Sequence, residues 1–247
     1  MFALRHLGPL ACLALVAALG CTATENETCE LTSDQLSVVA EVVDSGWDIR
    51  ASIDFESGDR QGTNSPVRLC ATDILTINGQ TPIETTKASS IEYHLDWEAD
   101  GERSVQFSIE RQSLGEVIDL AVELPPTFEI VSPMDDDPLD RTNGQALEWE
   151  PANPDGTMQI RLHEELGGGQ CIIDSDEQTY EEAGGVGVPD TGTWTIDASD
   201  LGSMTPLACN VTIGLTRVNL GDYPTTLGGG GRIEARTERE VDVADTE

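Results

Sequence analysis

Apolar and polar residues alternate in short runs along most of this chain, and that pattern restricts it to β structure. The clearest run places five residues on one face: Trp47, Ile49, Ala51, Ile53 and Phe55. Similar runs cover 91–97, 105–109 and 118–124. Because alternate side chains of a strand point to opposite faces, each run predicts a half-buried strand of an antiparallel sheet.

The same pattern restarts after Pro125-Pro126. Further strands are predicted around 128–130, 147–149, 158–162, 194–196, 209–215 and 233–235. Many short strands separated by turns are typical of β-sandwiches. We therefore expect an all-β protein with two tandem antiparallel β-sandwich domains, 29–125 and 126–247. A short repeat supports two related halves, since 109–116 and 215–222 share arginine, leucine and glycine at equivalent positions.

The first twenty residues have the organisation of a secretory signal peptide. Arg5 precedes an apolar run from Leu7 to Leu19, which is too short to span a bilayer because a spanning helix needs roughly 20 residues. The sequence Ala18-Leu19-Gly20-Cys21 resembles the lipobox of bacterial lipoproteins. The resemblance implies that 1–20 are removed, that Cys21 carries lipid, and that 21–28 form a polar tether. The alternative is an ordinary signal peptide cut nearby.

The same resemblance implies a location in the bacterial cell envelope. Thr22 follows the lipid-bearing cysteine, where lipoproteins retained at the inner membrane carry aspartate. The outer membrane is therefore favoured over the inner one.

Four cysteines remain after processing at Cys21: Cys29, Cys70, Cys171 and Cys209. An even number in an oxidising compartment indicates disulfides. Three pairings are open to four cysteines. Cys29–Cys70 with Cys171–Cys209 follows if each half folds by itself.

The charge of the chain is extreme and excludes some partners. There are 46 acidic and 13 basic residues, giving a net charge of −33. Such a surface repels nucleic acid and anionic lipid headgroups, so we expect no DNA or RNA binding. It attracts divalent cations and basic partners.

One acidic loop is the metal candidate of the sequence. Asp135, Asp136, Asp137 and Asp140 are close together around Pro138. Several carboxylates on one turn can hold calcium, although a solvated turn gives the same pattern. No other cofactor is expected.

The sequence predicts no enzyme. His94 and His163 are the histidines left in the mature chain, and they lie in different predicted domains. His163 begins a partial zinc-protease motif, but Gly167 occupies the place of its second histidine. A serine-hydrolase Gly-x-Ser-x-Gly elbow does not occur in the sequence.

The segment Asp190-Thr191-Gly192-Thr193-Trp194-Thr195-Ile196 is similar to the Asp-x-Gly-x-aromatic corner that leads into strand F of immunoglobulin-like domains. As a whole, the chain resembles secreted bacterial lipoproteins with tandem immunoglobulin-like or fibronectin-like modules. The resemblance implies fold and location and no activity.

We therefore predict a lipid-anchored, non-catalytic envelope protein with a structural or protein-interaction role. The alternative is a cell-surface module that binds a glycan, a peptide or calcium. Tyr180 and Tyr223 are its candidate ligand-binding residues, because both are expected in loops, where aromatic side chains can bind ligands. The expected partners are the membrane, through the lipid, and an envelope protein or glycan.

Overall fold

The computed structural model describes residues 26–57, 65–87, 90–99, 103–164, 177–180, 187–201 and 210–244. The protein is all-β, as the alternating pattern predicts. Its helical elements are single turns: η1 (Thr28–Glu30), η2 (Ser33–Gln35) and α1 (Ala198–Leu201). Residues 1–25, with the predicted signal peptide and Cys21, lie outside the described residues. In the described ranges no helix is long and apolar enough to cross a bilayer.

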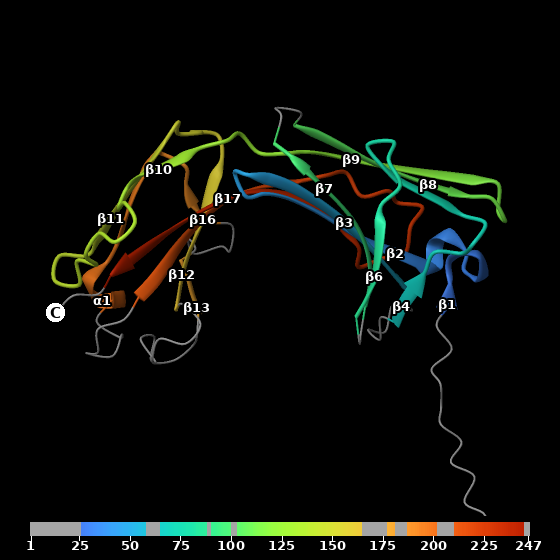
Figure 1. Ribbon diagram of the computed structural model, residues 1–247, viewed down its shortest axis with the longest axis horizontal. Helices are drawn as coiled ribbons and strands as arrows, with labels where there is room; N and C mark the ends of the chain where they lie inside the picture. The colour runs from blue at the N-terminus through green and yellow to red at the C-terminus, as the bar shows by residue number, and fades with distance from the viewer. Residues whose placement is uncertain are drawn as a thin grey trace, which may run out of the picture.

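One sheet of eleven strands runs through the whole molecule (Figure 1). Its main path is β1 (Asn26–Glu27), β4 (Ser65–Arg68), β3 (Asp48–Ser57), β2 (Leu36–Asp44), β17 (Arg232–Ala244), β16 (Asn210–Leu220), β12 (Thr157–Glu164) and β13 (Glu177–Tyr180). Three further strands pair beside this path: β7 (Ile91–Glu98) on β3, β6 (Ile83–Thr86) on β7, and β14 (Val188–Pro189) on β12.

Two smaller sheets of three strands complete the fold. The first consists of β5 (Ile74–Ile77), β8 (Ser104–Arg111) and β9 (Glu116–Glu123). The second consists of β10 (Glu129–Ser132), β11 (Gln145–Glu150) and β15 (Thr193–Ile196).

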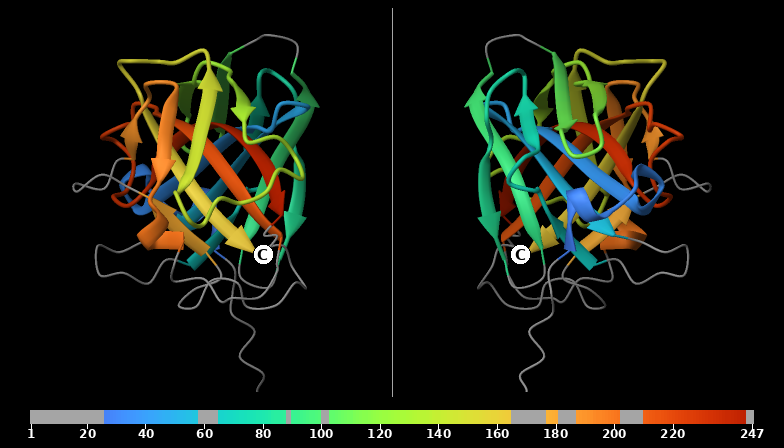
Figure 2. Two further views of the ribbon diagram at one scale, coloured as in Figure 1. Left: turned by 90° about the vertical axis from the view of Figure 1, so that its left-hand side faces the viewer. Right: turned by 90° about the vertical axis from the view of Figure 1, so that its right-hand side faces the viewer.

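Each small sheet shares a separate hydrophobic core with part of the large sheet. The first core joins β5, β8 and β9 to β2, β3 and β7, and the second joins β11 and β15 to β12 and β16. We call the parts around these cores the first lobe (β1–β9) and the second lobe (β10–β16 with the end of β17). Figure 2 shows the second lobe, in yellow and orange, from one end of the molecule, and the first lobe, in blue and green, from the other.

The thirteen-residue strand β17 belongs to both lobes. Its first half, Arg232–Thr237, pairs in parallel with Val39–Asp44 of β2, while β16 pairs antiparallel along its other edge. Ile233 is buried in the first core and Val243 in the second. A sandwich confined to 29–125 is therefore incomplete, because the C-terminal hairpin supplies one of its strands and part of its core.

The tip of this hairpin is hydrogen-bonded to β2 and β9. The Tyr223 hydroxyl accepts a hydrogen bond from the Val38 amide at 3.1 Å and donates one to the Gly228 carbonyl at 3.1 Å. The Asn219 side-chain amide donates to the Glu123 carbonyl at 3.0 Å. At Gly231 a Cβ atom would come within 2.4 Å of the Val38 carbonyl, so only glycine fits there. The hairpin thus fills the space between β2 and β9 of the first lobe.

The two arginines of the sequence repeat are both buried. Arg111 donates to the Thr28 carbonyl at 2.5 Å and to the Ser33 hydroxyl at 2.8 Å. Arg217 donates to the carbonyls of Pro126 and Thr127 at 3.0 and 3.1 Å. Each arginine therefore binds the backbone of the segment that enters its own lobe.

Shortening Ile233 to alanine tests the dependence of the first lobe on the hairpin. We expect Ile233→Ala to lower the free energy of unfolding by about 3 kcal/mol, because it leaves a cavity in the first core. Urea denaturation followed by circular dichroism measures the change. Leu220→Ala is the control on the same hairpin, since Leu220 is 75 % exposed. Equal, small effects of both substitutions would contradict a structural role for the hairpin.

Candidate functional site

The turn between β2 and β3 points toward the second lobe and is fixed by Asp44. The buried Asp44 carboxylate accepts hydrogen bonds from the Gly46 amide at 2.8 Å and from Arg103 at 2.6 Å. A guanidinium nitrogen of Arg239, from β17, lies 3.5 Å from the same carboxylate. Gly46 has a φ of +96°, a left-handed conformation that favours glycine. Trp47 follows it at the tip of the turn.

The connector between the lobes, 125–128, is held by arginine side chains. Arg103 and the Thr237 hydroxyl both donate to the Pro125 carbonyl. The Arg217 guanidinium stacks on the Phe128 ring, 4.7 Å from its centroid, and that of Arg239 lies 5.8 Å from it. The two lobes are therefore tied to each other by more than the shared strand.

Arg217 is held by a buried carboxylate. Asp190 accepts hydrogen bonds from two nitrogens of Arg217, at 2.6 and 3.1 Å, and one from the Trp149 indole at 2.7 Å. Arg217 is 2 % exposed and Asp190 is fully buried. A buried ion pair with its remaining polar atoms bonded is costly to break, so it fixes the position of the connector.

A cleft of about 730 Å³ lies between the β2–β3 turn and the second lobe. Its lining residues are Ser45, Gly46, Trp47, Glu129, Asp135, Glu238, Arg239 and Glu240. A smaller hollow of about 250 Å³ adjoins it, shares four of these residues and adds Ile130, Pro133, Met134 and Val241. The junction of two lobes is a common place for a ligand site, and the larger volume is within the usual range for one.

The cleft is acidic. Glu129, Asp135, Glu238 and Glu240 line it together with one basic residue, Arg239. Burial raises the pKa of Glu238 above its usual value, nearby Glu240 adds to the rise, and two arginines oppose it.

Trp47, the main feature of the cleft, is not predicted by the sequence pattern. Alternation puts Trp47 on the buried face of a strand with Ile49 and Phe55, but β3 begins at Asp48 and Trp47 lies in the turn. The prediction of burial is wrong for Trp47, which is 89 % exposed, whereas Ile49 and Phe55 are buried as expected. The preceding Ser45-Gly46 dipeptide, a turn signal, marks the strand end that the alternating pattern hides.

The acidic loop proposed for calcium uses its side chains on the backbone instead. Asp135 accepts a hydrogen bond from the Asp242 amide, and Asp137 accepts one from the Met134 amide. Asp140 accepts bonds from the amides that follow it, which lower its pKa. Asp136 lies on the same turn with a φ of 67°. In the described ranges these four aspartates do not converge on one point, as calcium ligands must.

The two tyrosines expected to bind ligands lie in different surroundings. Tyr180 is the last residue of β13, not a loop residue, because it pairs with Ile160 of β12. Tyr223 does lie in a loop, but it packs against the first core and its hydroxyl is bonded at the hairpin tip. Tyr223 is not among the described residues that line the cleft between the lobes.

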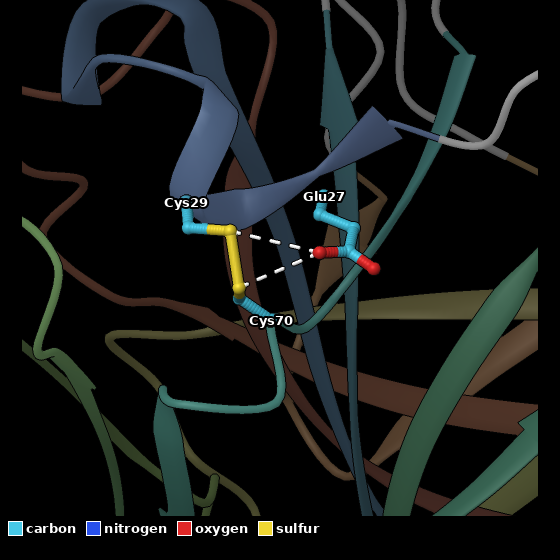
Figure 3. Close-up of side chains that lie close together, drawn as sticks. All are labelled: Glu27, Cys29 and Cys70. Atoms are coloured by element: carbon cyan, nitrogen blue, oxygen red, sulfur yellow. Dashed lines mark hydrogen bonds between the residues drawn. A yellow bond between two sulfur atoms is a disulfide. The ribbon is translucent and has the colours of Figure 1, made fainter.

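One disulfide, Cys29–Cys70, joins the N-terminal segment to the end of β4, and it is one of the pairings that the sequence left open. Glu27 Oε2 lies 3.6 and 3.5 Å from the two sulfurs (Figure 3). These three residues are the one convergent set of metal-type ligands in the described part of the chain. Because both sulfurs are bonded to each other, they cannot ligate a metal as thiolates. Cys171 and Cys209 lie outside the described residues.

The corner motif has a different role from the one that the resemblance implies. Thr193–Ile196 forms β15, which pairs with β11 and precedes the α1 turn, so Trp194 does not lead directly into the next long strand, β16. Asp190, the first residue of the motif, is the carboxylate that binds Arg217.

A second polar cluster lies on the outer face of β3 and β7. Burial raises the pKa of Asp54 to about 6, and the negative charge of Glu92 contributes. Burial also acts on Glu92, but hydrogen bonds from Lys87 and Arg50 outweigh it and lower the pKa of Glu92. The His94 side chain, expected to face solvent, is 12 % exposed beside Glu92.

Comparison of the chain with protein-family models, with curated proteins and with solved structures finds no match.

Substituting Gly46 tests how the cleft wall is built. A Cβ atom at Gly46 would lie 3.0 Å from the Arg239 guanidinium, whereas at Gly79, also left-handed, it would meet nothing within 4 Å. We expect Gly46→Ala to lower the free energy of unfolding by about 2 kcal/mol and Gly79→Ala by about 1 kcal/mol, since only the first displaces Arg239. Equal losses of stability for the two variants in thermal denaturation would show that Arg239 can move aside without a cost in free energy.

The raised pKa of Asp54 predicts a pH dependence of stability. The folded protein binds the proton of the Asp54 carboxyl more tightly than the unfolded chain does. Protonation of Asp54 therefore stabilises the fold fully below about pH 4, and this stabilisation is lost as the pH rises through about 6. Asp54→Asn should raise the free energy of unfolding by about 1 kcal/mol at pH 7.5, after allowance for solvent screening, and leave it unchanged at pH 3.5. Urea denaturation at both pH values measures this, with Glu123→Gln as an exposed control. The prediction would be refuted if Asp54→Asn changed the free energy of unfolding by the same amount at both pH values.

Proposed function

We propose that this protein is a lipid-anchored, non-catalytic interaction protein of the bacterial cell envelope, and that the cleft between its lobes is the binding surface. The observation that carries the proposal is the position of Trp47. Of the four tryptophans, all of them described, it is the exposed one, and it lines the cleft. Large aromatic side chains are the residues that most often dominate binding at protein interfaces.

The strand order supports an immunoglobulin-like identity for the first lobe. One face has the order β2-β3-β7-β6 and the other β5-β8-β9. Lettered along the chain, with the short β1 and β4 left out, these are A-B-E-D and C-F-G, the order of immunoglobulin constant domains. Sandwiches of this kind commonly serve as cell-surface recognition modules.

The second lobe supports the same interpretation. Its small sheet, β10-β11-β15, faces β13-β12-β16-β17. Lettered along the chain, with the short β14 left out, these are A-B-E and C′-C-F-G. The repeated arginines Arg111 and Arg217 then both lie on strand F, near the turn to strand G. The equivalent positions favour an origin of the two lobes by duplication.

The positions of the histidines support a non-catalytic role. His94 lies on β7 in the first lobe and His163 on β12 in the second. The two histidines therefore do not act together on one substrate or metal ion, as the two-histidine zinc sites of hydrolases require.

The proposed anchor determines which lobe lies near the membrane. Four residues lie between Cys21 and Asn26, so five Cα-to-Cα steps lead from the cysteine to Asn26, which begins β1 in the first lobe (Figure 1). An extended segment of this length spans about 17 Å at most. The first lobe, which contains β1, would therefore lie within reach of the membrane surface.

The anchor is tested by Cys21→Ser. We expect the wild-type protein to sediment with membranes and to carry acyl chains at its N-terminus in intact-mass measurements, because lipid on one cysteine is the proposed attachment. The serine variant should be found in the aqueous fraction without that mass. Cys12→Ser, a change inside the predicted signal peptide, is the control. A wild-type protein whose mature N-terminus is unmodified would rule out the anchor.

A further inference from the structure

The cleft between the lobes has an apolar residue at each end. Trp47 lines the larger hollow and Met134 the adjoining smaller one, and they are 89 % and 68 % exposed. Single exposed apolar side chains are common, but two of them along one hollow indicate a contact surface. Met134 adapts to many shapes because its side chain is unbranched and flexible.

The charge between these residues is negative. The single guanidinium of the cleft, Arg239, donates to the Asp44 carbonyl at 3.2 Å and to the Glu238 carbonyl at 2.6 Å, and it faces the Asp44 carboxylate. The positive charge of Arg239 is thus already paired with protein groups at the floor of the cleft. Glu129 extends into solvent, with 79 % of its side chain exposed.

The exposed edge of β17 adds a feature of a peptide site. Parallel pairing with β2 ends at Thr237, and the next backbone hydrogen bond on this edge is from Asp136 to the Asp242 carbonyl. Backbone groups two residues apart in a strand point to the same side, so those of Glu240 face the same edge as those of Asp242. No described group bonds to the Glu240 backbone there. The free backbone groups of Glu240 can pair with the main chain of one residue of an extended peptide.

The net charge of the whole chain excludes several classes of partner. At −33, a second copy of this chain, a nucleic acid or an anionic lipid surface is repelled. We infer that the cleft binds a basic segment of a partner protein in extended form, with an arginine or lysine over Trp47 and a neighbouring cation near Glu129 and Asp135. The inference rests on the proposed function in one respect, that this cleft is the binding surface.

Each part of the site has a defined task. The Trp47 ring attracts the cation through its π face, an interaction that arginine makes best. The carboxylates neutralise a second positive side chain, and the edge of β17 orients the main chain. Met134 packs against an apolar residue of the segment.

The test measures binding of acetylated tetra-arginine amide to the purified full chain. Isothermal titration calorimetry at about 50 mM salt gives the affinity, and the part of the change in tryptophan emission that is lost in Trp47→Ala reports on Trp47. We expect Trp47→Ala to weaken binding by about tenfold and Trp47→Phe by less, because phenylalanine keeps a weaker π face. Trp47 lies at an exposed turn, so both variants should fold, which circular dichroism checks.

A matched pair of double variants separates the cleft from the general charge. Glu129→Gln with Asp135→Asn removes two exposed carboxylates of the cleft, and Glu110→Gln with Glu123→Gln removes two exposed carboxylates of β8 and β9. We expect about tenfold weaker binding for the first pair and less than about twofold for the second. Equal losses for both pairs would overturn the inference, since they would indicate non-specific attraction to a polyanion.

Two more ligands decide between chemical classes. Acetylated tetra-glutamate amide should not bind, and a neutral tetrasaccharide of N-acetylglucosamine should not bind either. Saccharide binding that is lost in Trp47→Ala would overturn the inference while leaving the cleft as the binding surface. Absence of tetra-arginine binding in the wild-type protein would overturn it too. Neither result depends on Cys21, so the anchor stands or falls separately.

Discussion

The buried ion pair between Arg217 and Asp190 holds the arrangement of the two lobes. Arg217 is on a strand of the large sheet, yet its donors reach the carbonyls of Pro126, Thr127 and Pro151. Asp190 cancels the charge that would otherwise be stranded among apolar residues. Such a pair adds little net stability compared with apolar packing, because both ions lose their hydration. The pair instead fixes the orientation of the groups that it joins, because the planar guanidinium donates its hydrogen bonds in a few fixed directions.

The cleft is a consequence of that arrangement. The connector is held against β17, the β2–β3 turn is held by Asp44, and the space between them stays open above the middle of one strand. Arg239 contributes to both walls, because it faces Asp44 on one side and lies near the Phe128 ring and Glu129 on the other. A site built in this way depends on contacts between residues far apart in the chain.

The strands could be predicted from the sequence because alternation is local. Ile49 to Phe55 and Val105 to Ile109 are buried as the pattern requires. The continuous sheet could not be predicted in this way. The parallel ladder between 39–44 and 232–237 joins segments almost two hundred residues apart, and no local pattern encodes such a pairing. In β17 the apolar phase is also interrupted at Thr237 and Arg239, which serve the junction and not a core.

The candidate site was harder to predict from the sequence than the sheet. Trp47 fits the alternating phase of the next strand, so its exposure depends on where the turn ends. Asp135 and Asp137 were recognised as a cluster, but their use on backbone amides requires the neighbouring chain, since Asp135 binds a residue of β17. The repeat was the more reliable clue: Arg111 and Arg217, found by sequence, turn out to bind the entry segments of both lobes.

The parallel ladder between β2 and β17 also determines how the molecule would respond to force. The chain enters β2 from the end of the first lobe and leaves β17 at the far end of the second. Tension applied between these two ends pulls the neighbouring strands past each other along their length. Every rung of the ladder then carries the load at once, so the joint resists stretching where a hairpin pulled open from its ends would unzip one rung at a time.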